Sequence, residues 1–117
     1  MFQGIGQKFS RMNLAIGGVG LTRKLVMAKH LAVMLKSGLP IIEALSVARE
    51  AADGKLKIVL GEVLKSVGSG HTLSSSLAEY PRIFSGFFIN ATYAGETSGT
   101  LVESLENVAE QMEKEKE

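Results

Sequence analysis

Apolar residues recur at helical spacing along most of the chain, in segments that glycine and proline separate. The clearest segment covers residues 22–37, and Gly38 follows it as a helix stop. Its broad apolar face consists of Leu25, Met27, Ala28, Leu31, Ala32, Met34 and Leu35. Val26 and Val33 lie a heptad apart and off that face, so they predict a second, smaller apolar strip that a partner helix can cover.

Two more amphipathic helices follow in the first half of the chain. Pro40 suits the first turn of the second helix, because the N–H that proline lacks has no intrahelical partner there, and Asp53-Gly54 ends it. The expected buried side of this helix is Ile41, Ile42, Ala44, Leu45, Ala48, Ala51 and Ala52. A third helix covers about 55–67 and ends at Gly68-Ser69-Gly70. Its stripe is Leu56, Val59, Leu60, Val63, Leu64 and Val67.

The second half predicts three further helices. Thr72 can cap a short fourth helix that Pro81 closes. A fifth has its apolar face at Phe84, Phe87, Phe88, Ala91, Ala94 and Gly95. The sixth begins at Thr100, which forms a capping box with Glu103, and its stripe is Leu101, Leu105, Val108, Ala109 and Met112. No segment alternates like a strand, so we expect an all-α fold: a compact bundle of about six antiparallel helices over residues 21–117.

Residues 1–20 are expected to be an N-terminal arm or linker, with the pattern of a short basic amphipathic helix. Apolar residues recur there at helical spacing beside Lys8 and Arg11, at Phe2, Ile5, Phe9, Met12 and Ile16. Gly4 and Gly6 each weaken a helix by about 1 kcal/mol. Three interpretations stand: docking onto the bundle or a second subunit, binding to an anionic membrane surface, and a frayed arm.

Composition is that of an ordinary globular domain, with 45% hydrophobic and 21% charged residues. The absence of cysteine excludes disulfides and thiol nucleophiles, and no apolar run has the length of a signal peptide or membrane span, so we expect a soluble chain. The net charge of +1 hides an asymmetry, because residues 1–42 contain no acid and residues 96–117 contain seven glutamates. Either the two ends face oppositely charged partners, or they pair with each other or with solvent.

A search for catalytic chemistry finds no candidate set of residues. His30 and His71 each lack a second His or Cys nearby, and the glycines before residue 21 lack the spacing of a phosphate loop. Ser74, Ser75 and Ser76 lie in the first turn of a helix, where hydroxyls satisfy free backbone N–H groups. We therefore expect no enzymatic activity, no cofactor, no metal site and no nucleic-acid partner.

The most suggestive polar feature is a row of glutamates in the last helix. Glu103, Glu106, Glu110, Glu113 and Glu117 recur at three and four residues and form one acidic face opposite the buried stripe. Such a face can coordinate a hard cation such as calcium, contact a partner, or simply face solvent. Its first four glutamates, with Val26 and Val33, are the candidate partner contacts.

The segment before the last helix has the composition of a tight corner. Gly95 allows two helices to approach closely, Gly99 can adopt a positive φ, and Thr100 can cap the next helix. Glu96 has two interpretations: its carboxylate accepts hydrogen bonds from free N–H groups across the turn, or it marks a contact with a partner or metal.

Three stretches together resemble the type II secretion system protein F family. Residues 31–45 resemble its first motif, which includes Gly38 and Pro40. Residues 70–74, beginning with Gly70 and followed by Pro81 and Phe84, resemble its second landmark. Residues 94–101 resemble its Gly-Glu-x-Ser-Gly-x-Leu turn, formed here by Gly95, Glu96, Thr97, Ser98, Gly99, Thr100 and Leu101. Their order and spacing agree over roughly residues 22–113.

The resemblance implies a structural role. Members of the family are polytopic proteins of the bacterial inner membrane with two related helical domains on the cytoplasmic face, and they form the platform of secretion and pilus machines. It implies a non-enzymatic domain that couples the assembly ATPase to the membrane machinery, contacts other platform proteins and forms a homodimer. With one domain copy, no membrane helix and an unmatched first segment, the chain looks like an excised fragment, most similar to the first copy. The alternative is a free-standing soluble helical module that binds a partner without a membrane link.

Overall fold

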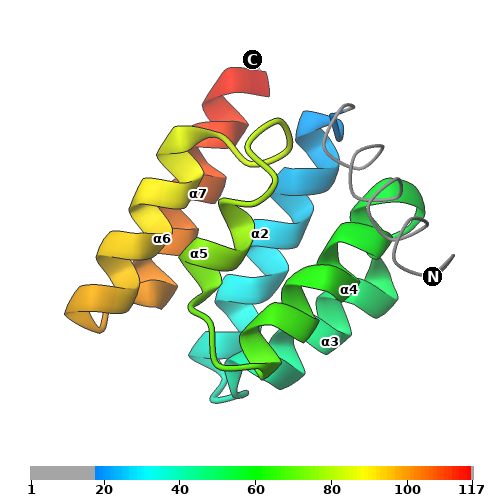
Figure 1. Cartoon of the computed structure of the whole chain (residues 1–117). Coiled ribbons are helices and arrows are strands. Elements are labelled where there is room, and N and C mark those ends of the chain that lie inside the picture. Colours follow the sequence, from blue (N-terminus) through cyan, green and yellow to red (C-terminus); the bar gives the residue numbers. More distant parts are fainter. Residues whose placement is uncertain (1–17, 117) are drawn as a thin grey trace, which may run out of the picture.

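The computed structural model describes residues 18–116, and this part of the chain folds into six α-helices without a β-strand (Figure 1). In chain order the helices are α2 (Leu21–Lys36), α3 (Ile41–Ala51), α4 (Gly54–Gly68), α5 (Leu73–Leu77), α6 (Gly86–Ser98) and α7 (Leu101–Lys116). The predicted all-α fold is confirmed. None of these helices is both long and apolar enough to cross a membrane.

Helix α2 lies at the centre of the bundle (Figure 1). It packs against α7 on one side and α3 on the other, while α4 covers α3 and α6 covers α7. The short α5 packs against both α4 and α6, which joins the two halves of the bundle. The core between them is closed by large, fully buried side chains, of which the bulkiest are Phe84, Phe88, Leu45, Leu60, Ile83 and Leu105.

The expected stripes of α2, α4 and α7 lie in or against this core. For α3 the buried side is narrower than expected: Ala44, Leu45 and Ala48 are buried, whereas Ile42 and Ala51 are exposed. The prediction for Ile42 and Ala51 was wrong because the main neighbours of α3 are α4 and α2, which leave the flanks of its apolar face uncovered.

Helix ends follow the glycine and proline signals with small shifts. Gly38 has a φ of 99° after α2, and the N–H of Leu39 donates to the carbonyl of Met34 at 3.1 Å, which completes the C-terminal turn. Pro40 is the residue just before α3 rather than part of its first turn. Gly68 remains helical, and the chain leaves α4 through Gly70.

The fifth predicted helix needs a correction, because α6 begins two residues after Phe84. The hydroxyl of Ser85 accepts a hydrogen bond from the N–H of Phe88 at 3.1 Å and caps the helix there. Phe84 therefore lies before the helix and packs edge-on against Phe88, with ring centroids 5.4 Å apart. The buried face of α6 is Phe88, Thr92 and Gly95. Phe87 and Ala94, predicted to be buried, are exposed.

Candidate functional site

The antiparallel pairing of α2 and α7 brings most of the candidate partner contacts together. A groove of about 400 Å³ runs between these two helices. Its lining residues, which define the α2–α7 groove, are Lys29, Ala32, Val33, Glu106, Ala109, Glu110 and Glu113. The small side chains of Ala32 and Ala109 lie in the packed interface, whereas Val33 is 62% exposed. One surface therefore combines Val33 with Glu106, Glu110 and Glu113, which lie 73 residues or more further along the chain.

Ion pairs across this groove account for part of the charge asymmetry. The ammonium of Lys29 donates to the Glu113 carboxylate at 2.9 Å, and that of Lys36 lies 3.9 Å from Glu106. The hydrogen bond from Lys29 lowers the pKa of Glu113, and the positive charge of the same ammonium adds to the effect. Within residues 18–116, Glu103 and Glu110 form no ion pair. The basic helix α2 and the acidic helix α7 therefore pair in part, and Glu103 and Glu110 keep a negative charge that no ion pair in the described chain balances.

The sequence analysis did not predict which lysines pair with the glutamates of α7, although the spacing of the two sets of residues is related. Lys29 and Lys36 are seven residues apart on α2, and Glu106 and Glu113 are seven residues apart on α7. Two antiparallel helices with opposite charges at the same spacing can form both pairs at once. The matched spacing of the two rows fits the pairing of α2 with α7 but does not select it, because Glu43 and Glu50 on α3 are also seven residues apart.

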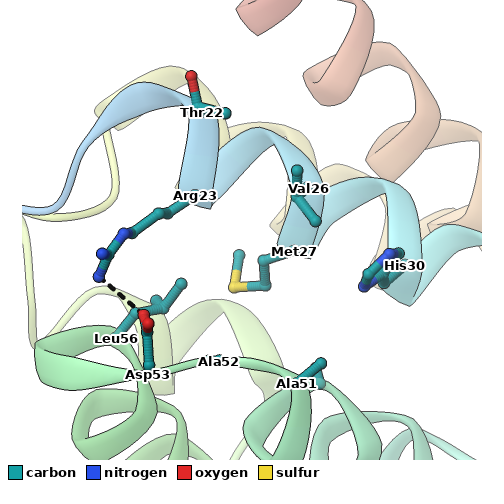
Figure 2. Close-up of a pocket in the computed structure, with 10 residues that line it drawn as sticks. Thr22, Arg23, Val26, Met27, His30, Ala51, Ala52, Asp53 and Leu56 are labelled. Carbon is teal, nitrogen blue, oxygen red and sulfur yellow. Dashed lines mark ion pairs between the residues drawn. The ribbon is translucent and has the colours of Figure 1, made fainter.

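Val26 lies on the same exposed face of α2 but borders a different groove (Figure 2). This α2–α3 groove, of about 180 Å³, has an apolar floor that includes Met27, Ala52 and Leu56. At one end Arg23 forms an ion pair with Asp53, with Nη1 and Oδ1 2.8 Å apart. Val26 is 42% exposed. The exposed face of α2 is therefore flanked by two grooves, one acidic and one mostly apolar.

The corner between α6 and α7 is a Schellman turn. Gly99 ends α6 with a φ of 72°, a conformation that costs a residue with a side chain about 1 kcal/mol. The N–H of Thr100 donates to the carbonyl of Gly95 at 2.8 Å. The predicted capping box is wrong, because this N–H is not free for Glu103 and the Thr100 hydroxyl lies 3.2 Å from the hydroxyl of Ser98 instead.

Gly95 is the point where α7 comes close to the backbone of α6. A Cβ atom built on Gly95 would lie 2.8 Å from Cβ of Ser104 and 3.0 Å from Cα of Leu101. Contacts this short are almost absent between real side chains, so the two helices pack at this distance only with glycine here. Gly95 is buried in the folded chain.

The carboxylate of Glu96 accepts hydrogen bonds from the N-terminus of α5 and not from the α6–α7 turn next to it. Its Oε2 accepts a hydrogen bond from the N–H of Leu73 at 2.7 Å, and its Oε1 accepts one from the N–H of Ser74 at 3.1 Å. The hydroxyl of Thr72 accepts from the N–H of Ser75 at 3.1 Å. Three free N–H groups at this helix start are thus satisfied, two of them by a carboxylate from α6.

The serine hydroxyls have a different role from the expected one. The hydroxyl of Ser75 donates to the carbonyl of Thr72. The hydroxyl of Ser76 lies 2.7 Å from the same carbonyl and 2.7 Å from the hydroxyl of Ser66 on α4. The backbone N–H groups that these serines were expected to satisfy donate instead to the side chains of Thr72 and Glu96. Since Glu96 lies in the third motif and its partners in the second, the two motifs meet in space at this contact.

The remaining motif residues lie in the connections between helices. Gly38 and Pro40 form the α2–α3 turn, Gly70 the α4–α5 turn, and Pro81 and the buried Phe84 the α5–α6 connection. Over residues 18–116, no group of three or more His, Asp or Glu side chains is arranged to hold a metal ion. Glu117 and the apolar stripe of residues 2–16 lie outside the described residues.

Comparison with known proteins gives consistent matches over most of the chain. Residues 27–117 match the family model described as type II secretion system (T2SS), protein F. The chain is 34% identical over 97 residues to the type II secretion system protein F of Vibrio cholerae, a match that covers 82% of this chain and 24% of the relative. It is 36% identical over 101 residues to the type IV pilus assembly protein PilC of Thermus thermophilus, covering 86% and 25%. The chain spans about a quarter of the length of these relatives.

Proposed function

The chain belongs to the type II secretion system protein F family, and from this premise we propose that it is a cytoplasmic helical domain of an inner-membrane platform protein. In this role residues 21–117 form the domain and residues 1–20 an arm. The domain links the cytoplasmic assembly ATPase to the membrane machinery and to other platform proteins, and it catalyses no reaction itself. Membrane attachment is a property of the platform protein as a whole.

The observation that carries this proposal is the α2–α7 groove. It combines an exposed apolar side chain, Val33, with an acidic rim at Glu106, Glu110 and Glu113. An amphipathic helix binds such a groove by inserting an apolar anchor and placing lysine or arginine along the rim. Glu110 has no ion-pair partner within the described chain, so its charge is available to a basic partner. This arrangement supports a protein partner with a basic amphipathic helix, which we assign to the ATPase.

A binding assay with purified ATPase tests this assignment. The variant Glu110→Lys reverses a charge in the groove without breaking either Lys29–Glu113 or Lys36–Glu106. Glu50→Lys makes the same change on the exposed surface of α3 and serves as the matched control. We expect Glu110→Lys to weaken binding at least about tenfold at low salt, and the control to leave it unchanged.

Salt and apolar variants sharpen the same test. Val33→Asp removes the exposed apolar side chain of the groove and should weaken binding at all salt concentrations, whereas the effect of Glu110→Lys should shrink as salt rises. If neither change affects binding, the ATPase does not use this groove. If the wild-type chain does not bind the ATPase at all, the coupling role is refuted.

We further propose that the domain forms a homodimer through α6. The exposed residues of this helix include Phe87 and Tyr93, 54% and 63% exposed, and the exposed side chains carry no charge: Phe87, Asn90, Tyr93, Ala94, Thr97 and Ser98. A two-fold contact brings the same patch of both copies together, so an uncharged face avoids the repulsion that the glutamate row would cause. Tyr93→Lys should shift sedimentation towards the monomer, while Val47→Lys on α3 should not. A wild-type chain that is monomeric at all concentrations would contradict this proposal.

A further inference from the structure

The described helices begin at two opposite ends of the bundle. At one end, the ion pair of Arg23 with Asp53 joins the starts of α2 and α4. A Cβ on Gly18, just before α2, would lie 3.8 Å from the carbonyl oxygen of Arg82, in the connection that leads to α6. The last turn of α7 lies at this end too, because α7 runs antiparallel to α2 (Figure 1). Helices α3, α5 and α7 begin at the opposite end, since α3 and α7 follow the ends of α2 and α6 and the start of α5 is bonded to Glu96.

The two ends differ in the charge at the helix starts. Glu43 and Glu103 lie in the first turns of α3 and α7, and Glu96 accepts the N–H groups at the start of α5. By contrast, the first turns of α2, α4 and α6 contain no acidic residue. Asp53, the residue before α4, forms an ion pair with Arg23 and makes no capping hydrogen bond. Because a helix start carries a partial positive charge, the starts of α2, α4 and α6 remain more positive than the other three.

Basic side chains gather at the end where α2, α4 and α6 begin. They come from the first turns of α2 and α4, the connection before α6 and the last turn of α7. These side chains define the basic end: Arg23, Lys24, Lys55, Lys57, Arg82, Lys114 and Lys116. The carboxylates beside them are fewer: Asp53, Glu79, Glu113 and Glu115. In the last turn of α3, Arg49 and Glu50 offset each other. The basic end therefore has a net positive charge.

The fold itself does not account for this charge. A lysine in the first turn disfavours a helix, because its ammonium repels the partial positive charge of the helix start. Within residues 18–116, Lys24, Lys57 and Lys114 form no ion pair that would compensate. Positions where a protein departs from a local structural preference without a gain in its own fold are commonly functional. The basic end is therefore suited to an anionic partner.

Two properties favour a lipid surface over an acidic protein segment. The basic side chains come from four separate elements, α2, α4, α7 and the α5–α6 connection, so a flat anionic surface contacts them together. A single acidic helix is about 10–12 Å wide and covers one or two of these elements. In addition, Ile58 is 54% exposed and directly follows Lys57 in α4. Basic residues beside an exposed apolar one are typical of segments that bind at the surface of an anionic bilayer.

We propose that the basic end binds the phosphate headgroups of an anionic phospholipid bilayer. Each lysine close to such a surface raises the affinity by about fivefold. In this orientation the end with Glu43 and Glu103 points away from the negatively charged lipid. The α2–α7 groove lies along the side of the bundle and stays accessible to a protein partner. The inference deepens the proposed function, on which it rests for the presence of a membrane, and it assigns the surface that faces the lipid.

Co-sedimentation of the full chain with lipid vesicles tests this proposal without the ATPase. At about 0.1 M salt we expect the chain to bind phosphatidylcholine vesicles that contain phosphatidylglycerol at least about tenfold more tightly than pure phosphatidylcholine. Lys57→Glu should weaken this binding at least about fivefold, and Lys24→Glu/Lys57→Glu at least about twentyfold. Lys65→Glu is the matched control, because it makes the same change of charge in the last turn of the same helix. Lys65 lies about 12 Å further along α4, beyond the screening length of about 10 Å, so its reversal should weaken binding less than about twofold.

Each outcome decides the proposal. An acidic residue in the first turn favours a helix, so Lys57→Glu should keep the fold, which far-UV circular dichroism checks. Equal weakening by Lys57→Glu and Lys65→Glu would overturn the proposal, because binding would then follow net charge alone. Binding that the double variant leaves unchanged would overturn it too, since another segment would make the contact. A wild-type chain that does not prefer anionic vesicles would overturn it in favour of an acidic protein partner.

The same variants separate this inference from the proposed function. Lys24→Glu/Lys57→Glu should leave the affinity for the ATPase unchanged, because neither lysine lines the α2–α7 groove. A chain that binds the ATPase but not the anionic vesicles refutes the lipid contact alone. A chain that binds the vesicles through the basic end but does not bind the ATPase refutes the coupling role alone.

Discussion

Replacing Gly95 with alanine tests whether close approach of α6 and α7 is a constraint on this fold. Two effects of opposite sign act on the variant. In a helix interior, alanine is favoured over glycine by about 1 kcal/mol. The added methyl group, however, would lie 2.8 Å from Cβ of Ser104 and 3.0 Å from Cα of Leu101. Overpacking typically costs about 1–3 kcal/mol, and here one neighbour is backbone that moves only if α7 moves with it.

We therefore expect the steric effect to be the larger one. Because one neighbour is backbone, we expect the steric cost to lie in the upper part of its range, at about 2–3 kcal/mol. Gly95→Ala should then lower the free energy of unfolding by about 1–2 kcal/mol, after the gain of about 1 kcal/mol in helix propensity is subtracted. The measurement is urea unfolding followed by far-UV circular dichroism, which is suited to a chain of this size if unfolding is two-state. A shift of the midpoint at constant slope reports the change in stability.

Gly61 provides the matched control, because it lies inside α4 without a close neighbour. A Cβ on Gly61 would be 3.7 Å from Cδ of Arg49, an ordinary contact. Gly61→Ala should therefore stabilise the chain by about 0.5–1 kcal/mol. The two glycine-to-alanine changes are predicted to have opposite signs, although helix propensity alone would give them the same sign.

The variant Ser104→Gly identifies the contact responsible. It removes the side chain nearest to the added methyl, so Gly95→Ala should be less harmful in its presence. The double-mutant cycle should give a favourable coupling of at least about 1 kcal/mol. A Gly95→Ala variant as stable as the wild type, or a cycle without coupling, would refute the argument that the corner requires glycine for close approach.

Three further predictions concern the corner and the ion pairs. Glu96→Gln should destabilise the chain by about 1–3 kcal/mol in urea unfolding, because a glutamine amide has only one oxygen with which to accept the two α5 N–H groups. Gly99→Ala should cost about 1 kcal/mol in the same assay, because its φ of 72° disfavours any side chain. Lys29→Met should raise the pKa of Glu113 towards its ordinary value in an NMR titration, and Lys36→Met should not. Since the Lys29 bond lowers the pKa of the folded state, its stabilising effect is present above the ordinary carboxyl pKa and is lost as pH falls through the lowered value.

The helices themselves were predictable from local patterns. Each apolar stripe reports which side of a helix is buried, and residues such as Gly38 and Thr72 mark ends that depend on nearby backbone groups only. Phe84 shows where this approach fails. The Ser85 cap starts α6 after Phe84, so Phe84 does not mark the buried face of the helix. That face is Phe88, Thr92 and Gly95, and it leaves Phe87 and Ala94 exposed.

The contacts of Glu96 were harder to predict for a different reason. Acceptance of hydrogen bonds from free N–H groups across the turn is one of the two interpretations that the sequence allows for Glu96. Its acceptors serve Leu73 and Ser74, more than 20 residues earlier in the chain. Local reasoning about the turn gives no access to a partner at this separation, because the pairing depends on how α5 packs against α6.

The charge asymmetry of the chain follows from the same packing and leads to the functional surface. The basic helix α2 and the acidic helix α7 are neighbours, so part of each charge is used between them, at Lys29–Glu113 and Lys36–Glu106. Exposed pairs of this kind contribute little to stability, so they do not by themselves account for a glutamate row longer than the lysine row. The glutamates without a partner in the described chain, Glu103 and Glu110, lie on the same face of α7, and Glu110 lines the groove beside Val33. This surface combines a glutamate without an ion-pair partner in the described chain, Glu110, with an exposed apolar side chain, Val33. Such a combination is typical of a binding surface. These properties support the proposal that a basic protein partner contacts this face of α2 and α7.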